Sequence, residues 1–280
     1  MNFEWTPFAI AYIASGTVAL VTALVAWKHR SRPGGAALCW LMLATAVWSF
    51  GNAMEICSVG SEAKTMWSNI EYAGITAVPV AWLAGTLSLA GKGEWFTRRN
   101  MLLLLVIPVA TQVFVWTNGY HGLMRYDVWL DESGPFAVIV KTYGPWFWIW
   151  TAYTYALLAT GTIGVMRTLV GLRGPYRAQA RLVAVGVLAP WAANILYISG
   201  LAPVGRPDIT PIALVISGLA GTLAILRYRF LDIQPIAWAT VIAGMDDGVV
   251  VTDDRGRVVA ANPAAQALTA HLQHPCAFRF

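Results

Sequence analysis

Charged residues are scarce in this chain. Lysine, arginine, aspartate and glutamate make up only 12% of its 280 residues, whereas a soluble globular chain carries about 25%. Hydrophobic residues make up 58% and the mean hydropathy is +0.58, so the composition excludes an ordinary soluble domain and predicts a membrane protein. The first residues, MNFEWTPF, lack the basic start of a secretory signal peptide, and no small-residue cleavage site follows the first apolar run. We therefore expect that run to be retained as a membrane span.

Residues that hold cofactors are missing from the apolar segments. The three cysteines form no Cys-x-x-Cys pattern and suggest no pairing. The four histidines all lie outside the predicted spans, which excludes an intramembrane haem held by two histidines. The last apolar run, TPIALVISGLAGTLAIL, contains no lysine, which excludes a retinal photoreceptor because its Schiff base needs one. We expect no cofactor and no metal site. The residues concerned are Cys39, Cys57 and Cys276, with His29, His121, His271 and His274.

Seven apolar stretches are long enough to cross a bilayer as helices, since a span needs about 20 apolar residues. Basic residues are unevenly distributed between the loops: twelve follow spans 1, 3, 5 and 7, and only four lie in the other loops. The positive-inside rule then places the N-terminus outside and the C-terminus in the cytoplasm. The sequence predicts an all-α membrane protein, a seven-transmembrane helix bundle that crosses the inner (plasma) membrane as a multi-pass protein. The predicted spans are about 7–27, 36–56, 66–90, 101–117, 145–167, 182–200 and 210–227.

The longest outer segment, 118–144, carries a hairpin pattern. Its runs YDVWL and FAVIV flank DESGP, and two β-rich runs around such a turn predict an antiparallel hairpin. Two interpretations stay open. The hairpin covers the outer mouth of the bundle as a lid, or it is a connector without such a role.

The composition changes again after Arg229. Pro235 predicts a break, and residues 248–252 and 258–261 predict two strands around the turn 253–256. Asn262 is a good helix N-cap and Pro263 suits the first helical position. We therefore expect a short cytoplasmic α/β segment of strand, turn, strand and helix, which is too short to bury a core of its own.

Two resemblances rest on these motifs. Segment 244–268, GMDDGVVVTDDRGRVVAANPAAQAL, resembles the first third of a PAS sensor domain. Residues 7–235 resemble the N-terminal seven-span sensory region of bacterial histidine kinases and related signalling proteins. The PAS resemblance is carried by Asp247, Gly248, Asp254, Gly256 and Asn262. The seven-span resemblance is carried by Glu55 ending span 2, Trp67 to Pro79 in span 3, Thr117-Asn118-x-x-His121, Pro190 with Asn194, and the exit RYRFLDIQPIA.

The resemblances imply a bacterial two-component receptor that drives a downstream kinase or cyclase. They imply a cytoplasmic signalling domain or partner kinase, a homodimer and no nucleic-acid partner. The sequence contains no phospho-acceptor helix and no ATP-binding lid, so we expect no enzymatic activity. The expected division is a sensor bundle in 1–229, a signalling linker in 230–243 and an incomplete PAS-like segment in 244–280.

Polar residues gather in the outer halves of the predicted spans. Positions three or four apart share a helix face, and such stripes occur in spans 2, 3 and 6, with further polar or aromatic groups in spans 4 and 5. An ionisable residue inside a span indicates function by default, and apolar walls with a few polar groups are typical of a ligand pocket. We therefore expect a pocket for an unknown small ligand. Its predicted residues are Asn52, Glu55, Glu71, Tyr72, Gln112, Trp191, Asn194 and Tyr197.

Other readings stay open for these residues. Glu71 fits a ligand-contacting acid, a proton sensor or a protonated tie between helices, which is worth about 0.6 kcal/mol per hydrogen bond. Glu55 also fits a position at the water interface. The sequence favours a membrane sensory receptor that detects an extracellular or membrane-borne cue and relays it through the exit of span 7. The alternative is a small-molecule or proton transporter that uses Glu55 and Glu71, but no internal repeat supports it.

Overall fold

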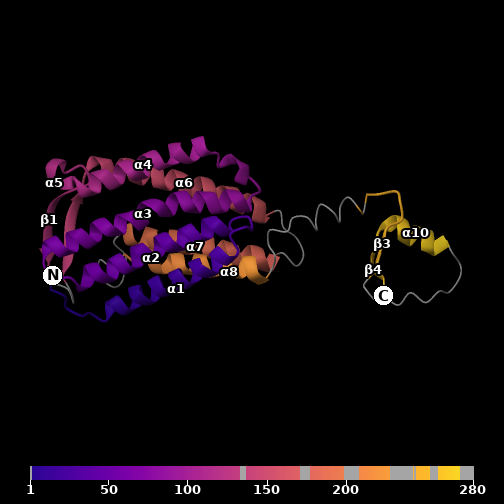
Figure 1. Ribbon diagram of the computed structural model, residues 1–280, viewed down its shortest axis with the longest axis horizontal. Helices are drawn as coiled ribbons and strands as arrows, with labels where there is room; N and C mark the ends of the chain where they lie inside the picture. The colour runs from indigo at the N-terminus through magenta and orange to yellow at the C-terminus, as the bar shows by residue number, and fades with distance from the viewer. Residues whose placement is uncertain are drawn as a thin grey trace. The chain divides into compact units, whose positions relative to one another are not determined.

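The computed structural model describes residues 2–132, 137–170, 177–198, 208–227, 242, 244–252 and 258–271. The chain divides into two compact units, Met1–Arg229 and Phe230–Phe280, which are treated separately below. The first unit is a bundle of long helices lying side by side (Figure 1). Its elements are α1 (Phe8–Lys28), α2 (Gly35–Cys57), α3 (Ser61–Leu89), η1 (Gly93–Trp95), α4 (Arg98–Trp116), α5 (Asn118–His121), β1 (Arg125–Asp131), β2 (Val138–Tyr143), α6 (Pro145–Val170), α7 (Arg177–Ile198) and α8 (Thr210–Arg227).

Four helices of the described chain, α1 to α4, are long and apolar enough to cross a membrane. Helices α6, α7 and α8 lie where the sequence predicts three further spans, and shorter apolar stretches occur at Ala184–Ile195 and Thr210–Leu223. That all seven cross the bilayer stays a prediction. The outward face of α4 supports lipid contact, because Leu102, Leu103 and Val106 are each more than half exposed and an exposed apolar stripe is stable in lipid.

The connection between α2 and α3 is shorter than the sequence predicts. A loop of about ten residues was expected from the end of one apolar run to the start of the next, but α3 begins at Ser61 and only residues 58–60 join the helices. Gly60 makes the tight turn with a φ of +88°. Lys64 then donates to the carbonyl oxygens of Glu55 at 2.8 Å and Ile56 at 3.4 Å. Hydropathy indicates where a helix enters lipid. It does not detect the polar first turn of α3, in which Lys64 binds the carbonyl oxygens at the end of α2.

Helix α2 occupies the middle of the bundle and packs on α1, α3 and α8. Helix α3 also packs on α4 and α6, whereas α7 packs mainly on α8. The α2–α3 approach is close because two glycines face the partner helix. A side chain at Gly74 would meet the backbone of Ala44 and Trp48, and one at Gly51 would meet Glu71. Small residues commonly allow such close packing between membrane helices.

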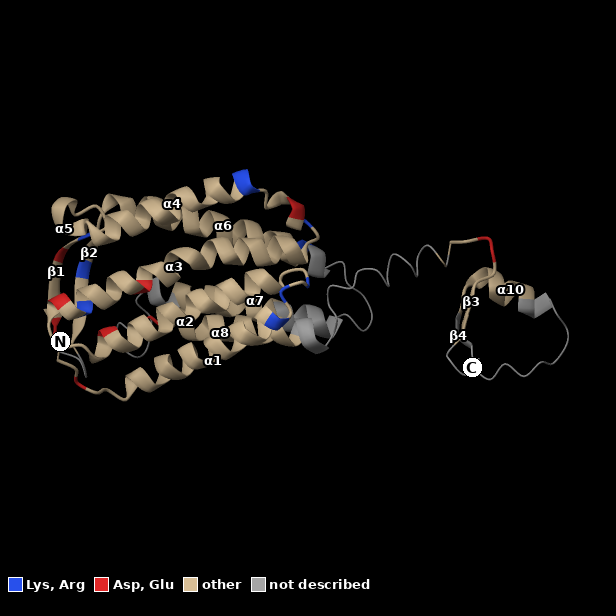
Figure 2. Cartoon of the chain, in the orientation of Figure 1, with Lys and Arg blue, Asp and Glu red and all other residues tan. Residues whose placement is uncertain are grey.

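The predicted hairpin is confirmed. Strand β1 pairs antiparallel with β2, with Arg125 opposite Tyr143 and Leu130 opposite Ile139. An irregularity follows Tyr126, where Asp127 adopts a positive φ of 49°. The hairpin crosses one end of the bundle, the end where the chain begins (Figure 1). We call this the hairpin end. Charged residues lie mostly at the two ends of the bundle, apart from acidic positions on α2 and α3 near the hairpin end (Figure 2).

The second unit contains β3 (Val250–Thr252), β4 (Val258–Ala261) and α10 (Pro263–His271). The two strands pair antiparallel, so the predicted order of strand, strand and helix is confirmed, although the first strand begins at Val250 and not at 248. Asn262 caps α10 because its Oδ1 accepts the N–H of Ala265 at 2.9 Å. The same side chain accepts from the N–H of Val249 at 2.8 Å and donates to the carbonyl of Asp247 at 2.8 Å. The predicted linker 230–243 lies outside the described residues except for position 242.

Candidate sensory site at the hairpin end

Glu71 is buried in the bundle near the hairpin end. The residue is only 5% exposed, and its buried Oε1 atom has no hydrogen-bond partner among the residues that the structure describes. Its side chain lies against Gly51 of α2, one turn before Glu55 on the same helix, and the Glu55 carboxyl group lies close enough to interact with it electrostatically. Because a buried polar atom without a partner is rare in proteins, Oε1 of Glu71 needs an explanation.

Glu55 lies at the edge of this site. It is partly exposed, two residues before the end of α2, which agrees with the interfacial reading of this acid. Its backbone is fixed by the ammonium of Lys64, which is itself 1% exposed. The site thus contains a deep acid on α3, Glu71, and a shallower acid on α2, Glu55.

Two further charged groups belong to this cluster and are absent from the sequence prediction. Lys141 of β2 and Asp208, which precedes α8, are both close enough to Glu71 to interact with it electrostatically. Burial raises the pKa of Asp208 above its ordinary value, although hydrogen bonds from Thr210 and the charge of Lys141 oppose the shift. The backbone N–H of Thr210 donates to the Asp208 carboxylate at 2.9 Å. Both groups lie just outside the apolar runs, where hydropathy gave no reason to select them.

The start of α8 is held by the helices around it. The hydroxyl of Tyr12 on α1 donates to the carbonyl of Asp208 at 2.9 Å. The amide of Asn194 on α7 donates to the hydroxyl of Thr210 at 3.4 Å and accepts from the hydroxyl of Tyr155 on α6. Asn194 was predicted as a ligand contact, and the structure places it as a tie between α6, α7 and α8 beside Asp208.

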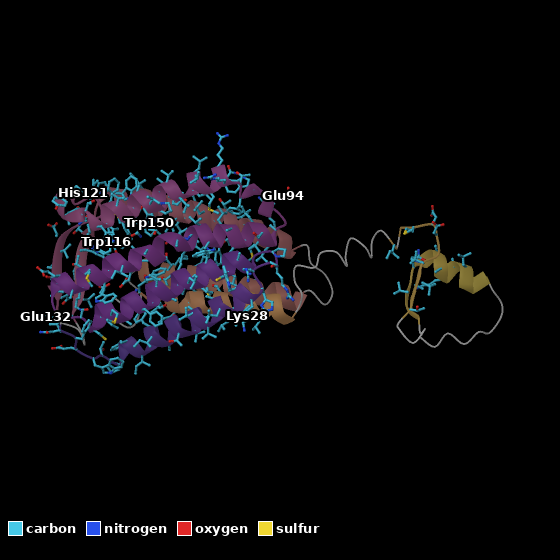
Figure 3. The ribbon with its side chains drawn as sticks, viewed as in Figure 1. Lys28, Glu94, Trp116, His121, Glu132 and Trp150 are labelled. Carbon is cyan, nitrogen blue, oxygen red and sulfur yellow. The ribbon has the colours of Figure 1, made fainter. Side chains whose placement is uncertain are left out.

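Two other predicted residues, Gln112 and Tyr72, contact different parts of the bundle. The amide of Gln112 donates to the hydroxyl of Thr76 at 3.0 Å, deeper along α3 than Glu71. Tyr72 packs in an apolar cluster, with its ring edge-on to Trp150 at 6.0 Å between centroids. Trp150 lies in the half of the bundle nearest His121 and Glu132 (Figure 3).

Three predicted residues remain. The amide of Asn52 is buried and donates to the carbonyl of Trp48 in its own helix at 3.2 Å. The indole N–H of Trp191 donates to the hydroxyl of Thr162 at 3.2 Å, so it joins α7 to α6. The side chain of Tyr197 lies outside the described residues.

The hairpin is anchored in the bundle by Arg125. This arginine is 5% exposed and donates to the hydroxyl of Ser68 at 3.1 Å and to the Asn69 side-chain carbonyl. The side-chain oxygen of Asn118 accepts the N–H groups of Met124 at 2.9 Å and Arg125 at 3.1 Å. Strand β1 is therefore tied to the α3 turn that precedes Glu71, and strand β2 brings Lys141 to the same place. Both strands are linked to the acidic cluster.

This arrangement suits the binding of positive charge. Three carboxyl groups, from Glu55, Glu71 and Asp208, lie within electrostatic range of the Lys141 ammonium, and Lys64 also acts on Glu55. Among the described residues, one carboxyl oxygen of Glu71 has no hydrogen-bond partner. Within the described residues, no group of three or more His, Cys, Asp or Glu side chains is arranged to hold a metal ion. Below the site, α3, α4 and α6 enclose an apolar cluster that includes Val80, Leu83 and Leu104.

Comparison with known families gives two matches. The family described as the N-terminal 7TM region of histidine kinase matches residues 11–235, and the family described as PAS domain matches residues 238–278. A search of curated proteins finds no match. The first match covers more than half of the chain, and the second follows it directly in sequence.

Proposed function

Since the chain belongs to the family of N-terminal seven-transmembrane regions of histidine kinases, we propose that it is the sensory module of a membrane receptor. A cue from outside the cell or from the membrane acts at the hairpin end of the bundle. The response leaves through the chain that follows α8 and reaches a cytoplasmic PAS and kinase-type output. The match to a PAS domain directly after the bundle supports this order. A location in the plasma membrane, the N-terminus outside and a homodimeric assembly belong to the same proposal.

The observation that carries the proposal is the unpartnered carboxyl oxygen of Glu71. A buried acid with an unused hydrogen-bonding atom costs free energy that a purely structural tie would avoid. The acid also interacts electrostatically with Asp208, which lies two residues before the start of α8. A change at Glu71 is therefore positioned to act on the helix that leads out of the bundle.

Helix α8 is suited to carry such a change. Its 18 residues extend about 27 Å at 1.5 Å per residue. It lies close to α2 because Gly218 and Gly221 face Met42 and Leu38, and Ser217 donates to the carbonyl of Gly186 on α7. Helix shifts of about 1–2 Å are sufficient in known switches, and a displacement at Asp208 would reach the other end of α8 through one continuous helix.

The transport alternative receives less support from this geometry. The acids gather near one end, and the apolar cluster around Val80, Leu83 and Leu104 lies farther along the same helices. A transported ion needs polar partners along its whole path through the membrane. The receptor proposal needs polar groups at one end only.

The proposal can be tested by fusing residues 1–280 to a histidine-kinase core with a measurable reporter. The fusion should respond to a change in the external medium, and Glu71→Gln should shift or abolish the response while the amount of protein in the membrane stays constant. Glu62→Gln provides the matched control, because Glu62 is an exposed acid at the start of the same helix. A normal response in Glu71→Gln would contradict the site, and equal loss in both variants would point to a general defect of α3.

A further inference from the structure

Two of the three carboxyl groups in the acidic cluster, those of Glu55 and Glu71, come from the facing helices α2 and α3, and this arrangement narrows the class of cue. The Glu71 side chain lies against Gly51, one turn before Glu55 on α2, and Glu55 lies close enough to interact with it electrostatically. A carboxylate can only accept hydrogen bonds, so a bond between two carboxyl groups requires one proton. Two carboxyl groups that share a site do not both ionise readily. The pair therefore has the chemistry of a proton-binding site.

The packing around Glu71 favours an occupant that needs little space. The side chain runs along Gly51, where even one added methyl group would overlap it. The next residue, Tyr72, is packed against Trp150, Val115 and Met124. A proton needs no cavity, whereas an organic ligand would have to displace these contacts. The unpartnered Oε1 atom is also less costly on a protonated acid than on a carboxylate.

Ionisable groups face Glu71 from most elements packed around it. Tyr12 lies on α1, Glu55 on α2, Tyr72 on α3 itself, Lys141 on β2, and Asp208 before α8. Tyr143 on β2 acts on Tyr72 and Lys141, and Lys64 on α3 acts on Glu55. Arg125 on β1 acts on Tyr72 and Lys141, and Tyr155 on α6 interacts with Asp208. Lys141 is the cation that acts directly on Glu71. Its ammonium lies 5.9 Å from the centroid of the Tyr143 ring, and within the described chain no carboxylate oxygen lies within salt-bridge distance of it.

We propose that the Glu55–Glu71 pair binds a single proton from the outer side and that Lys141 responds to its loss. This inference rests on the proposed receptor function and names its cue. In the protonated state the O–H of one acid donates to the other, and the pair carries one negative charge. When the proton leaves to water, the pair carries two negative charges and attracts the Lys141 ammonium more strongly. The pull draws β2 toward α2 and α3 and changes the field at Asp208.

The proton can be observed directly by infrared titration of the full 280-residue chain in nanodiscs of phosphatidylcholine. We expect wild-type protein to show a protonated-carboxyl C=O band that disappears as the pH rises. Glu71→Gln should remove this titrating band, and Glu62→Gln should retain it. An unchanged band in a folded Glu71→Gln protein would overturn the proposal, as would wild-type protein without a titrating buried carboxyl. If Glu71→Gln does not fold, Glu55→Gln provides a second test. The Glu71 acid remains in this variant, and loss of the neighbouring carboxylate should move the midpoint of its band to lower pH; an unchanged midpoint would contradict the pair.

The role of Lys141 has its own test in the same titration. Removing a nearby positive charge makes a carboxyl group hold its proton more tightly. Lys141→Met should therefore move the midpoint of the band to higher pH by about one unit, a tenfold change in proton affinity. Lys92→Met is the control, because Lys92 is an exposed lysine in the α3–α4 connection. Equal midpoints in Lys141→Met and wild-type protein would contradict the part played by Lys141.

The outcomes also separate this inference from the receptor function. A titrating Glu55–Glu71 pair in a fusion whose kinase output ignores every external change would retain the proton site and reject the receptor. A fusion that responds to some external change without any titrating pair would retain the receptor and reject the proton as its cue.

Discussion

The side chain of Glu71 occupies the space that a side chain at position 51 would need. The buried acid of α3 therefore depends on a glycine in α2. The dependence is local, because a Cβ added at Gly85 of α3 would meet only the Cβ of Ala37 on α2, at an ordinary distance of 3.7 Å. The position of the acid and the closeness of the two helices are thus one packing arrangement.

Substituting Gly51 should consequently disturb the site without removing any ionisable group. In Gly51→Ala, we expect Glu71 to be displaced and the bundle to lose about 1–3 kcal/mol, as is typical of overpacking. Thermal unfolding of the purified protein would measure the loss, and the kinase fusion would report the effect on output. Gly85→Ala, at the opposite end of the same helix pair, should change stability little. Equal stability in the two variants would contradict the close contact at Gly51.

Arg125 should hold the hairpin on the bundle. Arg125→Met leaves Ser68 and Asn69 without their donor, and a buried polar group that loses its partner costs about 1–3 kcal/mol. Hydrogen exchange at constant pH should become faster in β1 and β2, whereas α1 and α2 should exchange as before. Arg99→Gln, which removes an exposed arginine from α4, is the control. If exchange in the hairpin is the same in Arg125→Met and wild-type protein, the anchor is elsewhere.

Asp208 should make the bundle less stable as the pH rises. Burial raises its pKa in the folded protein, while the unfolded chain keeps an ordinary value of about 3.9. The folded state therefore binds the proton more tightly, so the associated stabilisation is present below the unfolded pKa and is lost as the pH rises through the folded pKa. Asp208→Asn cannot ionise, and its melting temperature should fall less than that of wild-type protein over this range. Parallel melting curves for the two proteins would show that Asp208 does not contribute this dependence.

Asn262 should be the most sensitive polar residue of the second unit. Its side chain joins α10 to the segment before β3 through both its oxygen and its nitrogen. Asn262→Ala should cost about 0.5–2 kcal/mol for the cap alone, with further loss from the other bonds. Asn262→Asp keeps the accepting oxygen and loses the donor, so its effect should be smaller. Hydrogen exchange of α10 in the full chain would rank the variants, and an Asp variant as weak as the Ala variant would show that the donated bonds dominate.

Hydropathy was sufficient to place the long helices of the bundle. The apolar runs correspond to α1, α2, α3, α4, α6, α7 and α8, and the β-rich runs around DESGP correspond to β1 and β2. These features could be predicted because lipid requires every backbone hydrogen bond to be satisfied within a segment. The polar turn Ser61–Lys64 was missed because its helical structure depends on the end of α2, which hydropathy does not describe.

The candidate site was less predictable than the helices. Helix periodicity selected Glu55 and Glu71 from two consecutive spans, and the structure places the side chain of Glu71 against α2 one turn before Glu55. Lys141 and Asp208 were not selected because they belong to a strand and a connection that tertiary structure brings to the acids. Asn194 was selected for its depth, but depth alone does not indicate that Tyr155 and Thr210 already use its amide.

The lysine that caps α2 has a consequence for any motion at this site. The ammonium of Lys64 binds the backbone carbonyl of Glu55, so the end of α2 is held by a contact that does not use the Glu55 carboxyl group. A switch needs a fixed element against which another element moves. The turn between α2 and α3 has the contacts of a fixed element, because the N-terminal segment also pairs with it at Ser58. A change of charge at Glu55 would then displace its neighbours and leave its own backbone in place.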